Sequence, residues 1–454
     1  MVRGFWRHRK APSVPHGPGS PGYPDPVPAS IWRNPTFVRV FGAATISLFG
    51  SLVTRTALPF TAILVLHAGP IEIAAIRACE IIGGVLVALV VGAWVDRLGR
   101  RPVMIVADLG QAIALGSVPV AAIGGWLSIG QLVVVAFATS ILTTFHNTAD
   151  VAYMPTVVEH DQLVAANSAM SASGSVAEFG GFSMGGFLVQ ILTAPIAIAV
   201  DAVSFLVSAV ILATIRRSEP SRPARTKRTS LLAEIRDGLR PIGRSPVLRA
   251  VMVAGSGAHL LWGAFGAIYL IFATDELGLG PATIGLIAAV GGISSFVGAL
   301  VANRTSRRIG IGPSIFLGLA GFTAGNVLVP LAPAGSALLA IVFLVGQQLI
   351  GDGAATIEEI SEISLLQTTV PNELLGRVNS TYEFVTHFWL LVGTVAAGVI
   401  GEVVGLRVAL GFGLIGGAIA LAAVWFSPLR NLRTPDAAVL DRPLLPVEDL
   451  PLAE

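Results

Sequence analysis

Long apolar runs separated by short polar breaks make up most of the chain. Each run has about 20 residues or more, the length that an α-helix needs to cross the hydrocarbon core of a bilayer. The runs lack the alternation of apolar and polar positions that a membrane barrel requires, so helices must satisfy the backbone hydrogen bonds in lipid. The pattern predicts an all-α membrane protein with twelve transmembrane helices, over residues 36–66, 71–95, 102–125, 131–152, 167–192, 195–215, 247–273, 282–302, 313–332, 336–360, 378–401 and 406–426.

Composition supports this interpretation. Of the 454 residues, 54% are hydrophobic and only 12% are charged, whereas a soluble domain has about 25% charged residues. This deficit excludes an ordinary soluble enzyme and a disordered chain. The single cysteine, Cys79, excludes an internal disulfide and a zinc site built from cysteines.

Basic side chains concentrate in every second loop, although the net charge is only +2. Cytoplasmic loops of membrane proteins carry an excess of Lys and Arg, so both termini are expected on the cytoplasmic side of the inner membrane. The opposite side holds only Arg77 and Arg407 near helix ends. The residues expected to face the cytoplasm are Arg97, Arg100, Arg101, Arg216, Arg217, Arg222, Arg225, Lys227, Arg228, Arg304, Arg307, Arg308, Arg377, Arg430, Arg433 and Arg442.

The basic break near the middle divides the chain into two similar halves. At one constant spacing, Thr156, Val158, Leu163, Asn167 and Ser168 match Thr368, Val370, Leu375, Asn379 and Ser380. Two parallel repeats predict two pseudo-symmetric six-helix bundles with a binding site between them. The expected organisation is a disordered cytoplasmic tail (1–35), the first bundle (36–215), a basic linker with a helix on the membrane surface (216–246), the second bundle (247–426) and a cytoplasmic tail (427–454).

Several motifs carry a resemblance to a known family. The string Gly92-Ala-Trp-Val-Asp96-Arg97-Leu-Gly99-Arg100-Arg101 resembles the loop motif between helices two and three of the major facilitator superfamily. Further phrases resemble the drug/proton antiporter branch that includes macrolide-efflux and enterobactin-exporter-like proteins. They are Leu48-Phe-Gly-Ser, Thr54-Arg-Thr-Ala-Leu-Pro59, Leu163-Val-Ala-Ala-Asn167, Val200-Asp201-Ala-Val-Ser-Phe205 and Leu374-Leu-Gly-Arg-Val-Asn379.

The resemblance implies alternating access, in which the bundles rock around a central cavity and protons entering from outside drive export. In the loop motif, Asp96 ends a helix beside a tight turn, and Gly99 permits close approach. Basic side chains there can pair with acids across the inner mouth, such as Asp150. The residues expected to form this gate are Asp96, Arg97, Gly99, Arg100, Arg101 and Asp150. The alternative is that the arginines only set the orientation.

Ionisable groups inside the hydrocarbon are costly and therefore point to function. We expect proton coupling at Glu178, Asp352 and Glu383, because burial favours the neutral form of a carboxyl group. The alternative is an ion pair or a helix–helix hydrogen bond that never titrates. Arg77 and Glu80 lie one helical turn apart and are expected to neutralise each other.

Aromatic and polar side chains on the candidate lining helices predict the substrate class. Apolar and aromatic walls with a few carboxylates suit small lipophilic, often cationic molecules. For any single aromatic residue, contact with lipid or with another helix is the more frequent alternative. The cavity candidates are Arg55, Phe145, His146, His259, Trp262, Tyr269 and His387.

Two features depart from the antiporter pattern. In Gly181-Phe182-Ser183-Met-Gly-Gly186, phenylalanine stands where drug exporters have proline, and the fourth helix has no arginine. Two enzyme-like strings, Gly181-Phe-Ser-Met-Gly185 and Gly411-Phe-Gly-Leu-Ile-Gly416, lie inside apolar helical runs rather than in the strand–turn–helix context that they require. The chain is therefore predicted not to be an enzyme.

Together these observations predict a secondary active exporter of small lipophilic compounds, exchanging them for protons across the inner membrane. It is expected to need no cofactor, no metal and no nucleic acid, and to work as a monomer in the lipid bilayer. The alternatives are a dedicated exporter of a metabolite or siderophore, facilitated diffusion, and a non-transporting receptor on the same scaffold.

Overall fold

The computed structural model describes residues 31–88, 91–215 and 239–434, and within these ranges it contains helices and no strand. Most of the linker with its expected surface helix, and most of both tails, lie outside the described residues. The first half consists of α1 (Pro35–Leu66), α2 (Pro70–Ala88), α3 (Val91–Leu98), α4 (Arg100–Gly124), α5 (Ile129–Val157), α6 (Leu163–Leu192) and α7 (Ala194–Ala213). The second half consists of α9 (Pro246–Ile271) with a π-turn (Phe272–Glu276), α10 (Pro281–Ile309), α11 (Ile311–Leu331), α12 (Ala337–Thr369), α13 (Asn372–Val403) and α14 (Leu406–Trp425).

The prediction of an all-helical membrane protein is confirmed. Among the described residues, ten helices are long and apolar enough to cross a membrane. α2 is outside this set because its 19 residues include Glu72, Arg77 and Glu80. Three helices continue beyond their predicted ends at 152, 302 and 360, because polar side chains there do not interrupt the helical backbone of α5, α10 and α12.

Local sequence explains where the helices begin and end. Asn34 accepts hydrogen bonds from the backbone amides of Thr36 and Phe37, which satisfies donors that the first turn of α1 leaves unpaired. Ser128, Ser245 and Ser336 cap α5, α9 and α12 in the same way. These four helices therefore start at a side chain that accepts hydrogen bonds from the amides of the first turn.

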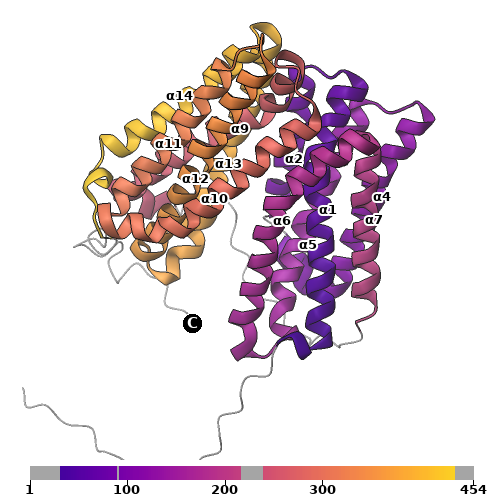
Figure 1. The fold of residues 1–454 in the computed structure, drawn as a ribbon. Helices are drawn as coiled ribbons and strands as arrows, with labels where there is room; N and C mark the ends of the chain where they lie inside the picture. Colours follow the sequence, from indigo (N-terminus) through magenta and orange to yellow (C-terminus); the bar gives the residue numbers. More distant parts are fainter. Residues whose placement is uncertain (1–30, 89–90, 216–238, 435–454) are drawn as a thin grey trace, which may run out of the picture.

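The most extensive helix contacts fall within each half. α1 packs against α7 and α6, and α4 against α7 and α5, whereas α9 packs against α13 and α14, and α12 against α11 and α10. Figure 1 shows these two groups, with the first half in indigo to magenta and the second in orange to yellow. Between the halves, the principal contacts join α6 to α10 and α2 to α13.

The apolar core differs between the two ends of the molecule. The connections at 67–69, 193 and 404–405 define one end, which the charge pattern predicts to face outward and which we call the outer end; the connections at 99, 158–162 and 370–371 define the inner end. At the outer end, one hydrophobic cluster includes residues of both halves, such as Phe60 and Phe272. At the inner end, the first half forms its own cluster around Phe37 and the second half another around Leu248. The halves thus share a core only toward the outer end.

Candidate functional site

Glycines bring the two halves together at the outer end. A side chain at Gly186 of α6 would meet the carbonyl oxygen of Pro281, and its Cβ would lie 3.0 Å from the Cα of Gly285 in α10. The Ser183 hydroxyl donates to the Gly285 carbonyl oxygen across 3.1 Å. On the other side, a Cβ at Gly401 of α13 would lie 3.0 Å from the Cβ of Pro70, at the start of α2. Backbone contact between the halves therefore closes this end on both sides.

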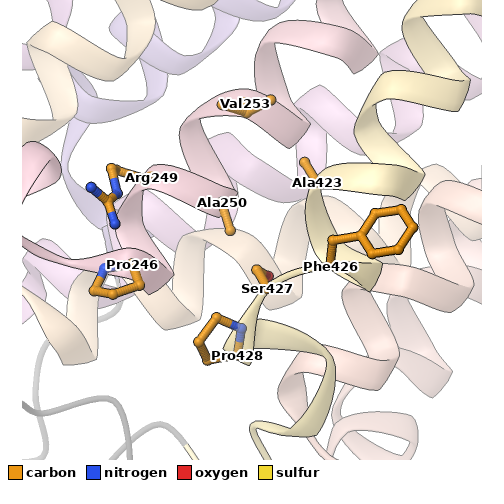
Figure 2. Close-up of a pocket in the computed structure, with 8 residues that line it drawn as sticks. All are labelled: Pro246, Arg249, Ala250, Val253, Ala423, Phe426, Ser427 and Pro428. Atoms are coloured by element: carbon orange, nitrogen blue, oxygen red, sulfur yellow. The ribbon is translucent and has the colours of Figure 1, made fainter.

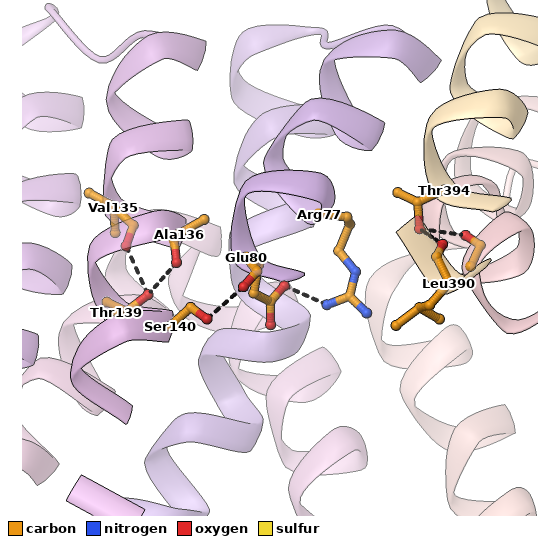
Figure 3. Close-up of polar contacts among 9 residues, drawn as sticks. Arg77, Glu80, Val135, Ala136, Thr139, Ser140, Leu390 and Thr394 are labelled. Atoms are coloured by element: carbon orange, nitrogen blue, oxygen red, sulfur yellow. Dashed lines mark hydrogen bonds and ion pairs between the residues drawn. The ribbon is translucent and has the colours of Figure 1, made fainter. Parts of the chain in front are cut away.

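An ion pair lies beside this contact. Arg77 Nη1 and Glu80 Oε2 of α2 are 2.6 Å apart, so the predicted neutralisation is confirmed. The Ser140 hydroxyl of α5 donates to the Glu80 carbonyl oxygen across 2.6 Å. Figure 3 shows Arg77 pointing from α2 toward the helix that carries Leu390 and Thr394. A positive group thus faces the second half from within an apolar region.

Tyr269 and Asp352 lie near each other in the second half. The Tyr269 hydroxyl of α9 is buried and has no hydrogen-bond partner among the described residues. Asp352 of α12, a predicted coupling residue, packs against Gly291 of α10 and is only half-exposed. This arrangement leaves a buried hydroxyl group on α9 and a half-exposed carboxyl group on α12 near each other in the second half.

A buried acid–histidine cluster occupies the inner half of the first bundle. Asp108 of α4 has no exposed surface, and its Oδ1 lies 2.7 Å from His146 Nδ1 of α5. The Ser208 hydroxyl of α7 donates to Asp108 Oδ2 across 2.6 Å. Asp150 lies one turn along α5 from His146, and its Oδ1 is buried without a hydrogen-bond partner among the described residues. Three helices thus place two carboxyl groups around one imidazole.

A second cluster occupies the corresponding region of the other half. Glu358 and Glu362 lie one turn apart on α12, and Glu362 is 7% exposed. The Tyr382 hydroxyl of α13 lies within hydrogen-bonding reach of Glu362. Gly255 of α9 makes room for this hydroxyl, since a side chain there would collide with it. Two acids and one phenol therefore meet where three helices pack.

The two clusters occupy equivalent positions in the repeats. The spacing that aligns Thr156 with Thr368 also aligns His146 with Glu358 and Asp150 with Glu362. At 1.5 Å per helical residue, His146 and Glu358 each lie ~16 Å from the inner end of their helix, and Asp150 and Glu362 each lie ~10 Å from it. Sequence reasoning missed Asp108 and this equivalence, although extending the repeat spacing along α5 would have revealed the latter.

The other predicted cavity residues are dispersed. His259 of α9 and His387 of α13 face each other with ring centroids 6.0 Å apart. Trp262 is half-exposed and stacks on Phe322. The structure also places Phe145 edge-on to Trp94, and Arg55 on an exposed face of α1. Among the predicted coupling residues, Glu383 is exposed and accepts a hydrogen bond from Asn379, and the Glu178 side chain lies outside the described part.

The loop motif is tightly bound to its own half. Gly99 has a φ of 82°, a left-handed conformation that favours glycine. Arg101 donates from Nε to the Leu212 carbonyl oxygen across 2.8 Å and from Nη2 to that of Ala213 across 2.7 Å, at the end of α7. Arg97 is exposed and Arg100 is buried, whereas the Asp96 side chain lies outside the described part. The gate remains a prediction.

A shallow pocket opens at the inner end between α9 and α14 (Figure 2), and its volume is about 360 Å³. It is lined by apolar groups such as Val253 and Phe426, with Arg249 at one side. None of the predicted cavity residues contributes to it. Within the described ranges, no group of three His, Cys, Asp or Glu residues has an arrangement suited to a metal ion.

Comparison with known proteins gives one family. Residues 40–394 match the model of the Major Facilitator Superfamily. The chain is 27% identical over 417 residues to the multidrug efflux pump Tap of Mycolicibacterium fortuitum, covering 88% of this chain and 97% of Tap. It is 21% identical over 321 residues to macrolide efflux protein A of Streptococcus pyogenes, covering 70% and 77% of the two chains.

The fold also matches solved structures. A bacterial homologue of the iron transporter ferroportin in an inward-facing state superposes with a TM-score of 0.69 at 18% identity, covering 86% of this chain and 98% of the other. The nucleoside transporter NupG gives a TM-score of 0.68 at 14% identity, covering 86% of this chain and 97% of NupG. At these identities, the likeness concerns the fold alone.

Proposed function

Since the chain belongs to the major facilitator superfamily and is a transporter rather than an enzyme, we propose that it exports small lipophilic compounds across the cytoplasmic membrane in exchange for protons. It does so by alternating access between two six-helix bundles with twelve transmembrane helices in all. Both termini lie in the cytoplasm, as the positive-inside rule requires. The protein acts as a monomer.

The uneven packing of the two halves carries this proposal. The halves share one apolar core toward the outer end and have separate cores toward the inner end. This is the packing expected of a state closed to the outside. Rocking about the α6–α10 and α2–α13 contacts would open the outer end and bring the inner ends together.

The substrate class is inferred from two observations. The named relatives are efflux pumps for multiple drugs and for macrolides. In addition, aromatic side chains such as Trp262 and Phe145 are only partly buried, and the helices that carry them face the boundary between the two halves in this family. Apolar and aromatic surfaces with few fixed charges favour lipophilic and cationic molecules.

Coupling and gating complete the proposed cycle. Glu178, Asp352 and Glu383 bind and release protons as access alternates, and the loop-motif residues with Asp150 hold the inner end closed in the outward-open state. Asp352 supports this proposal best, because it is a carboxyl group beside the buried Tyr269 hydroxyl in the second half. Acidic side chains within transmembrane helices commonly serve as proton relays, and the half-exposed carboxyl group of Asp352 can exchange a proton with water.

Transport in proteoliposomes tests this function. An imposed pH gradient, acidic on the side facing the outer end, is expected to drive accumulation of the lipophilic cation ethidium, and Asp352→Asn is expected to abolish the effect of the gradient. Asp275→Asn is the matched control, because Asp275 is an exposed aspartate of the second half outside the proposed coupling residues. Ethidium flux that persists unchanged without the gradient would contradict antiport. An absence of flux for ethidium and macrolides would favour a dedicated substrate or a receptor.

A further inference from the structure

The cluster of Asp108, His146 and Asp150 has an unbalanced charge. Asp108 has no exposed surface, and a buried carboxylate is stable only when it is paired or protonated. The imidazole of His146, 2.7 Å from Asp108, is its cationic partner when it is protonated. One imidazolium neutralises only one of the two carboxylates. The second remains as a buried negative charge unless it takes a proton.

The described side chains that contact Asp108 and His146 from the neighbouring helices are neutral, and the arginines Arg97 of α3 and Arg100 of α4 lie toward the inner end. α7 contributes the neutral Ser208, and α4 contributes Gln111, which accepts a hydrogen bond from Thr143 of α5 across 2.7 Å. On α2, Glu80 lies farther outward and is already paired with Arg77. Arg100 lies ~12 Å from Asp108 along α4, toward the inner end.

The cluster of Glu358, Glu362 and Tyr382 has the same property. Its two carboxyl groups lie one turn apart, and Glu359 on the same helix adds a further negative charge. The surrounding helices contribute Gly318 of α11, Gly255 of α9 and the Tyr382 hydroxyl of α13. α10 also packs on α12, and its arginines Arg304, Arg307 and Arg308 are exposed near its inner end. Glu362 is buried and Glu358 is partly buried, and two such adjacent carboxyl groups repel each other when both are ionised, so the pair is stable when it shares one proton.

We propose that these two clusters, equivalent in the two repeats, are proton-binding sites, one in each half of the protein. This inference rests on the proposed exchange of protons and deepens it, because it assigns proton binding to groups other than Glu178 in the first half and other than Asp352 and Glu383 in the second. The proton binds a carboxylate oxygen and leaves from the same oxygen, so no other bond changes. The equal depth of the clusters places both ~10–16 Å from the inner end, where the separate cores lie.

Infrared difference spectroscopy of the purified full-length protein tests proton binding without any substrate. Lowering the pH is expected to increase the absorption of protonated carboxyl groups. Asp108→Asn and Glu362→Gln should each remove part of this increase, and the double variant should remove more than either alone. Thr143→Val is the control for the first site, because it breaks a neutral hydrogen bond between the same two helices one turn away. Thr386→Val is the control for the second, because it breaks a neutral hydrogen bond to the Tyr382 carbonyl oxygen on α13 and leaves every carboxyl group in place. A titration identical to that of the wild type in both test variants would overturn the inference.

Transport separates this inference from the proposed function. In proteoliposomes, Asp108→Asn and Glu358→Gln should reduce gradient-driven ethidium accumulation much more than they reduce ethidium counterflow. The two control variants should change accumulation and counterflow by the same factor. A wild-type protein without gradient-driven accumulation would contradict the proposed function, and the infrared titration would still decide the inference. Normal coupling in the wild type and in both test variants would leave the function intact and overturn these two sites.

Discussion

At the scale of single residues, Arg407 provides a test of stability. Its Nε lies 2.5 Å from Glu276 Oε1, and its Nη1 donates to the Pro330 carbonyl oxygen across 2.6 Å. Its guanidinium also lies 5.2 Å from the Phe272 ring centroid. Because the ion pair is partly exposed, Arg407→Ala is expected to destabilise the protein by about 1 kcal/mol rather than by the larger cost of a buried pair.

Thermal unfolding in detergent measures this change. Arg430→Ala is the comparison, because Arg430 lies over the Trp425 ring at 5.5 Å and therefore tests the loss of a cation–π contact alone. Equal melting temperatures for Arg407→Ala and the wild type would show that the Glu276 and Pro330 contacts contribute no net stability.

Local spacing along the chain predicted some residue contacts and missed others. Arg77 and Glu80 are neighbours on one helix, and their predicted pairing is confirmed at 2.6 Å. Asp108 could not be recognised as part of a cluster, because its partners His146 and Ser208 lie on α5 and α7. Such contacts depend on which helix faces pack together, and an isolated apolar run contains no such information.

At the scale of helices, the apolar pattern predicted the positions well because twenty-residue apolar runs have few alternatives in a bilayer. The ends were less accurate. α12 continues to Thr369, whereas the predicted run stopped at 360, since a helix does not have to end where the membrane ends. The pairing of α6 with α10 and of α2 with α13 depends on glycines such as Gly186, whose role appears only in three dimensions.

The α6–α10 contact gives an element-scale prediction. Gly186→Leu would drive a side chain into the backbone of Pro281 and Gly285, so it is expected to weaken the closed outer end and shift the protein toward an outward-open state. In a Cys79→Ala background, a cysteine introduced at the outer end should be labelled faster. Export should fall by about tenfold if the shift between the two states costs ~1.4 kcal/mol.

Gly174 provides the matched control on the same helix. A Cβ at Gly174 meets no atom within 4 Å, so Gly174→Leu should leave labelling and export close to wild type. Unchanged labelling in Gly186→Leu would show that the α6–α10 contact does not hold the outer end closed.

At the scale of the whole molecule, the duplication and the charge pattern predicted the class of fold, and the family match confirms the class. The sequence did not reveal which end is closed. That property follows from residues of both halves, such as Phe60 and Phe272, joining one core while Phe37 and Leu248 belong to separate cores. It depends on how the two bundles are oriented. A chain with two stable arrangements can adopt either orientation, so its sequence alone does not specify which end is closed.

Reversible cross-linking at the outer end tests alternating access most directly. In a Cys79→Ala background, Gln190→Cys and Gly280→Cys place two thiols across the α6–α10 contact, because a Cβ at Gly280 would lie 3.2 Å from Gln190 Oε1. We predict that a short thiol cross-linker stops ethidium export, that breaking the link with a reducing agent restores it, and that either single variant is unaffected by the reagent. Full export by the cross-linked double variant would contradict the account, because its outer end could not have opened.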